Sequence, residues 1–371
     1  MSADPRPVTV DGDPEGLDAG PSMDPRSTAM VLCGLAAVVL FAVVAFLPVP
    51  YVIERPGAAI DTLGEAGGTP LISIEGRDTY PTEGTLDLTT VSVFGGPGRT
   101  VDLTDLVKGW LDPTAAVVPE EQLFDPDVTE DEIAEQNTEA MVSSQENATA
   151  AALGELEIGV PTTLTVVGFT EGSDAEAQLR ESDVVESVAG VPVDDLPQLR
   201  EALQEVEPGE PVTVGLVRDD AERGVDVRTL EGPEGQTLLG VLIDPFYEFP
   251  FEVTIQIEDV GGPSAGAMFA LGIVDKLTPG AMTGGERIAG TGTIDSAGEV
   301  GPISGIVQKM VGAREAGARW FLAPASNCGE VSSHVPEGMT VVSVETLAQA
   351  RDAVEAIGSG DAGALPACPA S

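Results

Sequence analysis

A serine flanked by small residues, Ser264, is the first residue in this sequence that could carry out chemistry. It lies in the segment Gly-Gly-Pro-Ser-Ala-Gly at 261–266, where little side-chain bulk shields its hydroxyl or the neighbouring backbone N–H groups. The apolar residues 265–277 that follow predict a buried helix, and a helix N-terminus favours an anionic intermediate. A serine before an apolar helix is also a common cap, so this segment alone leaves both roles open.

Few groups in the chain could take a proton from this serine. The only histidine, His334, stands in a polar segment typical of a surface loop, and we expect no metal site because a histidine-based site needs more ligands. Lys309 lies in an apolar helical pattern, whereas Lys276 ends the predicted helix. A desolvated lysine has a lowered pKa and can act as a base, but a lysine at a helix start can also extend into water.

The composition bounds the fold and the partners. The 371 residues suffice for two or three domains, and 42% hydrophobic content indicates a folded chain. The formal charge of −45 excludes nucleic acid as an expected partner, because phosphate binding needs clusters of Lys and Arg. Cys328 and Cys368 lie in polar, loop-like surroundings, so a disulfide between them is a hypothesis that requires an oxidising compartment.

The N-terminal part predicts a membrane anchor. Residues 1–27 are polar and acidic and predict a disordered tail, and residues 28–48 form an apolar stretch of the length that one spanning helix needs. A cleaved signal peptide, the alternative, usually has a shorter apolar core. Arg6 and Arg26 precede the span, which favours a cytoplasmic N-terminus. We therefore expect a single-pass protein of the cell membrane whose remaining chain is extracytoplasmic.

Two regions without apparent chemistry follow. Residues 49–128 contain turn signals and an alternating segment at 85–93, and predict a small β-rich, membrane-proximal region. Residues 129–162 predict a helical connector, since no proline or glycine interrupts 129–153.

Residues 163–236 form a distinct unit of strands around an amphipathic helix at 194–206. The unit resembles a PDZ domain of the kind attached to bacterial proteases, on Gly172-Ser173, Asp183, Gly190 and that helix. Ser182 stands where the family usually has glycine, and 157–161 match its carboxylate-binding loop poorly. The resemblance implies that an extended peptide adds to the sheet as a strand, and the alternative is a packing spacer.

Residues 237–358 alternate strands and helices and predict an α+β or α/β domain, followed by a flexible tail at 359–371. Within this domain, Pro263-Ser264-Ala265-Gly266, Thr291-Gly292, Pro302-Ile303 with Gly305, and Lys309 resemble the proteolytic domain of Lon proteases in type and order. With the span and the PDZ-like unit, the chain is similar to membrane-anchored, PDZ-containing Lon-like serine proteases. The fold class is therefore multidomain: a transmembrane helix, a β-rich region, a PDZ-like domain and an α+β Lon-type domain.

The resemblance implies a Ser–Lys dyad. Ser264 would be the nucleophile, Lys309 the general base, and Thr291 would orient the lysine. The backbone N–H groups of Ser264 and Ala265 would form the oxyanion hole. Two departures from the family are Ser304, where glycine is common, and Gly261, where an acidic residue is common.

The resemblance also bears on cofactors and partners. No Gly-x-x-x-x-Gly-Lys-Ser/Thr loop occurs, so we expect no cofactor and activity without ATP. Proteins or peptides would be the substrates, and the resemblance to Lon-type domains implies self-assembly into a ring, with a hexamer as the expected form. The alternative to an anchored serine endopeptidase is a non-catalytic scaffold whose PDZ-like unit binds envelope proteins.

Overall fold

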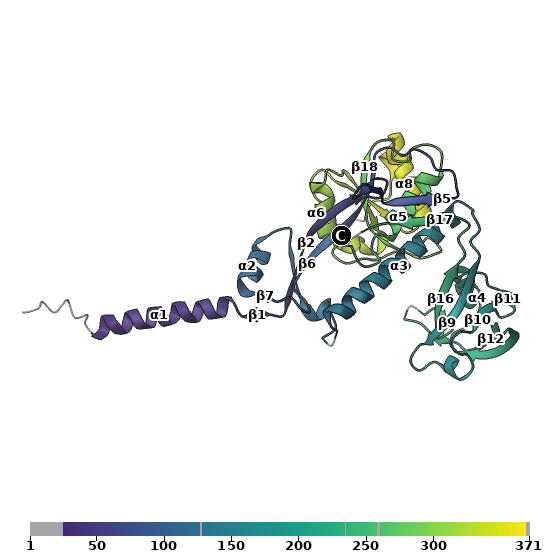
Figure 1. The fold of residues 1–371 in the computed structure, drawn as a ribbon, viewed down its shortest axis with the longest axis horizontal. Coiled ribbons are helices and arrows are strands. Elements are labelled where there is room, and N and C mark those ends of the chain that lie inside the picture. Colours follow the sequence, from purple (N-terminus) through teal and green to yellow (C-terminus); the bar gives the residue numbers. More distant parts are fainter. Residues whose placement is uncertain (1–24, 127, 234, 258–259, 369–371) are drawn as a thin grey trace, which may run out of the picture.

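The computed structural model describes residues 25–126, 128–233, 235–257 and 260–368, so most of the predicted tail at 1–27 lies outside the described residues. Figure 1 shows three parts: an extended helix α1, a central body, and a smaller unit of strands to one side. Helix α1 (Pro25–Ala45) has almost all of its side chains exposed. Within the described chain it is the one helix long and apolar enough to cross a membrane. Both of its ends lie three residues before those of the predicted span 28–48.

The central body is built on a six-stranded sheet in the order β22-β21-β18-β6-β2-β8. Four strands run parallel, β6 (Thr85–Phe94), β18 (Arg287–Gly290), β21 (Trp320–Pro324) and β22 (Thr340–Val344). The other two, β2 (Tyr51–Asp61) and β8 (Ala116–Pro119), extend the sheet in antiparallel fashion.

The prediction that 49–128 form a separate β-rich region is therefore wrong. Strands β2, β6 and β8 belong to the same sheet as the strands of 237–358, with β6 hydrogen-bonded to β18. Leu86 and Leu88 of β6 are fully buried in the core of the body. A local alternation of polar and apolar residues predicts a strand but does not say which distant strand pairs with it.

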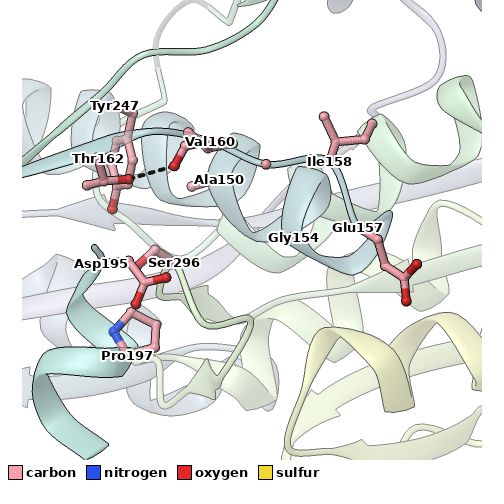
Figure 2. Close-up of a pocket in the computed structure, with 11 residues that line it drawn as sticks. Ala150, Gly154, Glu157, Ile158, Val160, Thr162, Asp195, Pro197, Tyr247 and Ser296 are labelled. Atoms are coloured by element: carbon pink, nitrogen blue, oxygen red, sulfur yellow. Dashed lines mark hydrogen bonds between the residues drawn. The ribbon is translucent and has the colours of Figure 1, made fainter. Parts of the chain in front are cut away.

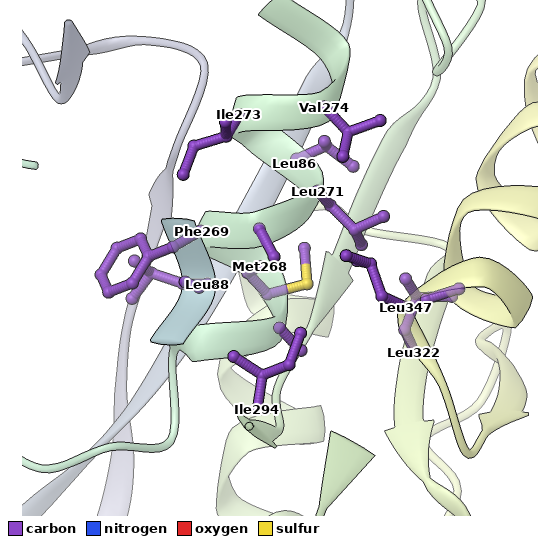
Figure 3. Packing of buried hydrophobic residues seen from close by; sticks show 14 of the residues in the cluster. Leu86, Leu88, Met268, Phe269, Leu271, Ile273, Val274, Ile294, Leu322 and Leu347 are labelled. Carbon is purple, nitrogen blue, oxygen red and sulfur yellow. The ribbon is translucent and has the colours of Figure 1, made fainter. Parts of the chain in front are cut away.

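Two helices cover the faces of this sheet. Helix α5 (Gly266–Leu277) is buried over nearly its whole length, and Figure 3 shows its Met268, Phe269 and Leu271 among Leu86, Leu88 and Leu322 of the sheet. Helix α6 (Ile306–Glu315) packs on the other face, where Ile306 and Met310 contact a cluster with Phe321. Because side chains alternate across a strand, the same strands supply both cores.

Helix α3 (Glu130–Glu155) is more than the expected connector. It begins with a capping box, in which Thr129 and Glu132 satisfy each other's free backbone N–H groups. Its C-terminal half, including Ala148 and Ala152, is buried against α5 in the main core. Small residues allow this close approach, and they carry too weak a hydrophobic signal for the sequence to predict it.

The expected flexible tail is also partly fixed. Helix α8 (Leu347–Ser359) packs in the core, and the Ser343 backbone N–H donates to the Pro366 carbonyl at 2.8 Å. Cys328 and Cys368 are joined in a disulfide with Cα atoms 5.0 Å apart, which is the pairing that the sequence left as a hypothesis. The crosslink joins this segment to the rest of the body. Residues 369–371 of the predicted tail lie outside the described residues.

The smaller unit is a sheet in the order β13-β12-β10-β9-β16, and α4 (Leu196–Gln204) covers its core. Its strands are β9 (Thr162–Phe169), β10 (Val184–Val188), β11 (Val191–Pro192), β12 (Pro211–Arg218), β13 (Ala221–Arg228) and β16 (Val241–Tyr247). Ser182, at the position where a glycine was expected, has a φ of 72° in the left-handed region.

The predicted boundary at 236/237 is wrong, because β16 pairs antiparallel with β9 and closes the PDZ-like sheet. Strand β16 is last in the strand order, so its outer side is an edge within the described residues. The loop before this edge strand contains Gly240, whose φ is 76° and where a Cβ would clash with the Ser173 hydroxyl. The loop at 157–161 precedes the inner strand β9, so it is not the loop beside the sheet edge.

Short elements complete the fold. Two-stranded ladders join β1 (Pro48–Val49) to β7 (Val101–Asp102), β3 (Glu65–Ala66) to β4 (Thr69–Pro70), β5 (Ile72–Glu75) to β17 (Glu252–Ile255), β14 (Leu230–Glu231) to β15 (Thr237–Leu238), and β19 (Thr293–Ile294) to β20 (Val300–Gly301). The remaining helices are α2 (Leu103–Leu111), α7 (Cys328–Val331) and the 3₁₀ turns Glu120–Gln122, Asp174–Ala177, Ala325–Asn327 and Ala362–Ala364.

Candidate active site

Three residues singled out from the sequence meet in the body. The Lys309 Nζ lies 2.7 Å from the Ser264 Oγ and 3.1 Å from the Thr291 Oγ1. The Thr291 hydroxyl donates to the backbone carbonyl of Ser264 at 3.0 Å. Lys309 is only 3% exposed and Thr291 1%, whereas Ser264 is half-buried. A serine hydroxyl that can be reached from outside therefore touches an amine that water hardly reaches.

The local fold directs Lys309 toward the serine. Helix α6 begins after Gly305, which has a φ of 67°, and a Cβ there would lie 2.7 Å from Val91. The preceding loop is held by Asn327, whose side chain accepts from the Ile303 N–H at 3.0 Å and donates to the Ile303 carbonyl at 2.9 Å. Lys309 thus lies in the first turn of a helix whose start is fixed from two sides.

The loop that carries Ser264 is held by neighbours on both sides. The Gly292 N–H donates to the Ser264 carbonyl at 2.9 Å, which joins the serine to the Thr291 segment. On the other side, the Ser144 hydroxyl of α3 donates to the Pro263 carbonyl at 3.0 Å, and the Gly262 N–H donates to the Asn137 carbonyl at 3.1 Å. The serine hydroxyl is therefore presented on a backbone with little freedom.

Backbone N–H groups beside the serine are available to a ligand. Within the described part of the chain, no backbone carbonyl accepts from the N–H of Ser264 or Ala265. Ala265 is the N-cap of α5, so these groups lie at the positive end of a long buried helix. This placement suits stabilisation of a negative oxygen.

Burial is the main influence on the charge of Lys309. It lowers the pKa of the amine from its usual value to about 8, and the negative charge of Glu54 partly opposes this effect. Burial also raises the pKa of the Glu54 carboxyl. The negative charge of nearby Glu330 raises this pKa further, and the positive charge of Lys309 lowers it. At pH 7 roughly one lysine in ten at this position would be neutral and able to accept a proton.

Ser264 and Lys309 line an open cavity of about 810 Å³. Its wall includes Glu54, strand residues 90–93, the start of α3 and the loop 302–304. A second cavity, of about 270 Å³, is shown in Figure 2 between the C-terminal end of α3, Asp195 and Pro197 at the start of α4, and Ser296 of the body. It holds neither Ser264 nor Lys309, so it belongs to the junction of the two units rather than to the candidate site.

Sequence reasoning missed several residues of the site. Glu54 lies in β2, far from the motif, and nothing in its local sequence distinguishes it from other strand residues. Asn137 and Ser144 lie in α3, which was expected to be a connector. The sequence offers one signal: Ser144 stands three residues after Met141 and four before Ala148, so a helix would place it on their apolar side.

Comparisons with known proteins agree with the geometry. Residues 258–355 match the family model described as the Lon protease (S16) C-terminal proteolytic domain. Lon protease 1 of Bacillus subtilis (strain 168) is 31% identical over 107 residues, which are 27% of this chain and 14% of that protein. The Lon protease of Clostridium beijerinckii is 35% identical over 89 residues, 23% of this chain and 11% of that protein.

The chain thus spans a small part of the length of the curated relatives that it matches. Among solved structures, the PDZ domains of SdrC-like proteins from Listeria monocytogenes and Listeria innocua each cover 22% of this chain. Their identities are 14% and 13%, both TM-scores are 0.21, and the alignments cover 85% and 92% of those domains. The family match at residues 258–355 and the curated relatives make the C-terminal part of the chain similar to the proteolytic domain of Lon proteases, in agreement with the motifs.

Proposed function

We propose that the protein is a membrane-anchored serine endopeptidase that works without ATP through a dyad of Ser264 and Lys309. The observation that supports this most strongly is the 2.7 Å contact between the buried Lys309 amine and the Ser264 hydroxyl at an open cavity. A non-catalytic scaffold would have no need for a desolvated lysine in contact with a serine hydroxyl. The hypothesis of a protease is therefore favoured over that of a non-catalytic scaffold.

The reaction follows from the placement of the groups. The neutral Lys309 amine takes the Ser264 proton while the Oγ attacks the peptide carbonyl carbon. The resulting oxyanion accepts hydrogen bonds from the N–H groups of Ser264 and Ala265. The Lys309 ammonium, oriented by the Thr291 hydroxyl, gives its proton to the leaving amine. Water then attacks the acyl-enzyme carbonyl and gives a proton to Lys309, which passes it to the Ser264 Oγ as the ester bond breaks and the carboxylic acid product leaves.

The other parts of the chain are proposed to anchor the protein and to bind its substrate. Helix α1 is proposed to span the membrane, with the body on the extracytoplasmic side, where the Cys328–Cys368 disulfide would persist. The free edge of β16 is proposed to accept an extended peptide as an added strand. We also expect self-association, as the Lon resemblance implies.

The test is hydrolysis of a fluorescently labelled, unstructured protein such as casein by the full chain in detergent or nanodiscs. Ser264→Ala, Lys309→Ala and Lys309→Arg should each lower kcat/KM at least about a thousand-fold, since arginine cannot act as a base. Ser92→Ala and Lys108→Arg serve as matched controls, because Ser92 lines the same cavity without contacting Lys309, and Lys108 is exposed.

Circular dichroism and thermal melting would show that each variant is folded. Equal turnover by the wild type and the dyad variants would refute the proposal and leave the scaffold as the better description.

A further inference from the structure

Helix α2 carries an apolar face that the fold leaves uncovered. Val107 is 43% exposed, Trp110 64% and Leu111 79%. Their spacing of three and four residues places them on one side of the helix. The charged residues lie elsewhere on the helix, where Lys108 pairs with Asp105 at 2.9 Å. The helix is therefore amphipathic, with its largest apolar side chains turned to the outside.

These side chains are not needed to hold α2 on the body. The buried side of the helix is formed by Leu106, which joins the small core of Ile53 and Val101, and by Gly109. A Cβ at Gly109 would lie 3.0 Å from Val117 and 3.3 Å from Ile53, so the helix backbone sits close against the sheet. Exposure of a tryptophan and a leucine to water is unfavourable in free energy. Their position on the outer side of a well-packed helix indicates that this side contacts something other than water.

The position of α2 indicates what that surrounding is. Strand β1 follows α1 after two residues and pairs with β7, with Pro48 opposite Asp102. Asp102 is the N-cap of α2 and accepts from the N–H of Thr104 at 2.8 Å. Helices α1 and α2 approach within 8 Å, Cα to Cα, and Figure 1 shows α2 just beyond the C-terminal end of α1, before the body. The apolar face thus lies where α1 would leave a bilayer.

We propose that α2 lies in the interface of the phospholipid bilayer, with Val107, Trp110 and Leu111 inserted at the level of the headgroups and upper acyl chains. Tryptophan prefers this layer because its ring is apolar and its N–H is polar. The attraction is apolar rather than electrostatic, since the chain carries a charge of −45 and α2 contributes one lysine. The inference rests on the proposed function in one respect, the insertion of α1 into the membrane.

The consequence is a protease held close to the membrane surface. Glu54, in the wall of the catalytic cavity, lies five residues after Val49 of the β1–β7 ladder. Five residues of extended chain span at most about 18 Å. With α1 and α2 both attached to the bilayer, the body has little freedom to tilt away. The substrate class that fits is a protein segment located within a few nanometres of the membrane.

Quenching of Trp110 fluorescence by brominated phosphatidylcholine tests this inference. The full chain contains two tryptophans, so the difference between wild type and Trp110→Phe isolates the emission of Trp110. In proteoliposomes of brominated lipid, the Trp110 emission should be lost in large part relative to unbrominated lipid. Val107→Asp with Leu111→Asp should abolish this loss, whereas Val191→Asp, at an equally exposed valine of the PDZ-like unit, should leave it unchanged.

Flotation of the same proteoliposomes after carbonate washing separates the two claims. Protein that floats with unquenched Trp110 overturns the inference while leaving the α1 anchor intact. Protein that does not float overturns the anchor and the inference together. Trp110 emission that is not quenched by brominated lipid but shifts on dilution of the protein would show that the apolar face of α2 contacts a second copy of the chain. That result also overturns the inference. Casein hydrolysis in detergent reports on the dyad independently of all these outcomes.

Discussion

Polar side chains at the Ser264–Lys309 cavity and at the junction with the PDZ-like unit are held in different ways. At the cavity, Lys309 and Thr291 are almost fully buried and hydrogen-bonded to each other and to Ser264. At the junction, Arg200 of α4 pairs with Asp295 of the body at 2.6 Å, but their side chains are 58% and 29% exposed. The Tyr247 hydroxyl contacts Asn147 of α3 at 3.0 Å.

The difference has energetic consequences. A hydrogen bond to a charged group in a desolvated site is worth about 1.5–3 kcal/mol, whereas an exposed ion pair contributes about 0–1 kcal/mol. Ser264, Thr291 and Lys309 are therefore held in place by buried contacts, whereas the Arg200–Asp295 pair at the junction is one that water can replace. The contrast shows that the Ser264–Lys309 group and the junction between the units are constrained to different degrees in the same chain.

Thr291→Val gives the largest effect of the changes that sharpen this comparison. Valine keeps the shape of the side chain but removes the hydroxyl that contacts the Lys309 Nζ and the Ser264 carbonyl. The loss should lower kcat/KM by about 10–100-fold, because the lysine becomes an ammonium in the transition state. Thr291→Ser keeps the hydroxyl and should retain most of the activity. Casein hydrolysis measures both, and equal activity of the two variants would show that the hydroxyl does not act.

Glu54→Gln should move the pH dependence rather than abolish activity. The base form of Lys309 is neutral, so kcat/KM should rise with pH through a midpoint near the lysine pKa of about 8. The Glu54 charge raises that pKa, so its removal should lower the pKa and shift the midpoint to lower pH. Glu54→Asp, which keeps the charge, is the control. A midpoint that stays in place or rises would contradict the coupling between the two groups.

Arg200→Ala should have the smallest effect on catalysis. It removes an exposed ion pair between the units, so casein hydrolysis should change less than about two-fold. Arg200 is the better partner to mutate, because Asp295 also accepts from the N–H groups of Ala297 and Glu299 in its own turn. Small-angle scattering should show a wider spread of distances between the units. A ten-fold change in kcat/KM would break the comparison, since it would couple the junction to the catalytic groups.

Local patterns predicted the helices and strands well in this chain. The expected helix 265–277 is α5 at 266–277, and the expected strand 85–93 is β6 at 85–94. The helix expected at 194–206 is α4 at 196–204. These elements carry clear periodicity of apolar residues, which depends only on neighbours in sequence.

Domain limits were predicted less well. The β-rich region 49–128 turned out to supply half of the strands of the central six-stranded sheet, and β16, expected in the proteolytic domain, closes the PDZ-like sheet. An apolar strand fits any sheet that buries both of its faces, so its partner depends on contacts far along the chain. For the same reason the sequence did not reveal Glu54, which reaches the cavity only through the pairing of β2 with β6.

By itself, the sequence determined the residue types and their order: a serine between small residues, a threonine, a lysine in an apolar helix, and an apolar segment long enough to span a membrane. Only the tertiary structure decided that the lysine amine lies 2.7 Å from the serine hydroxyl and that its pKa falls to about 8. The physical reason is desolvation, because the burial of a side chain depends on residues brought from β2, α3 and the sheet, which no local pattern specifies.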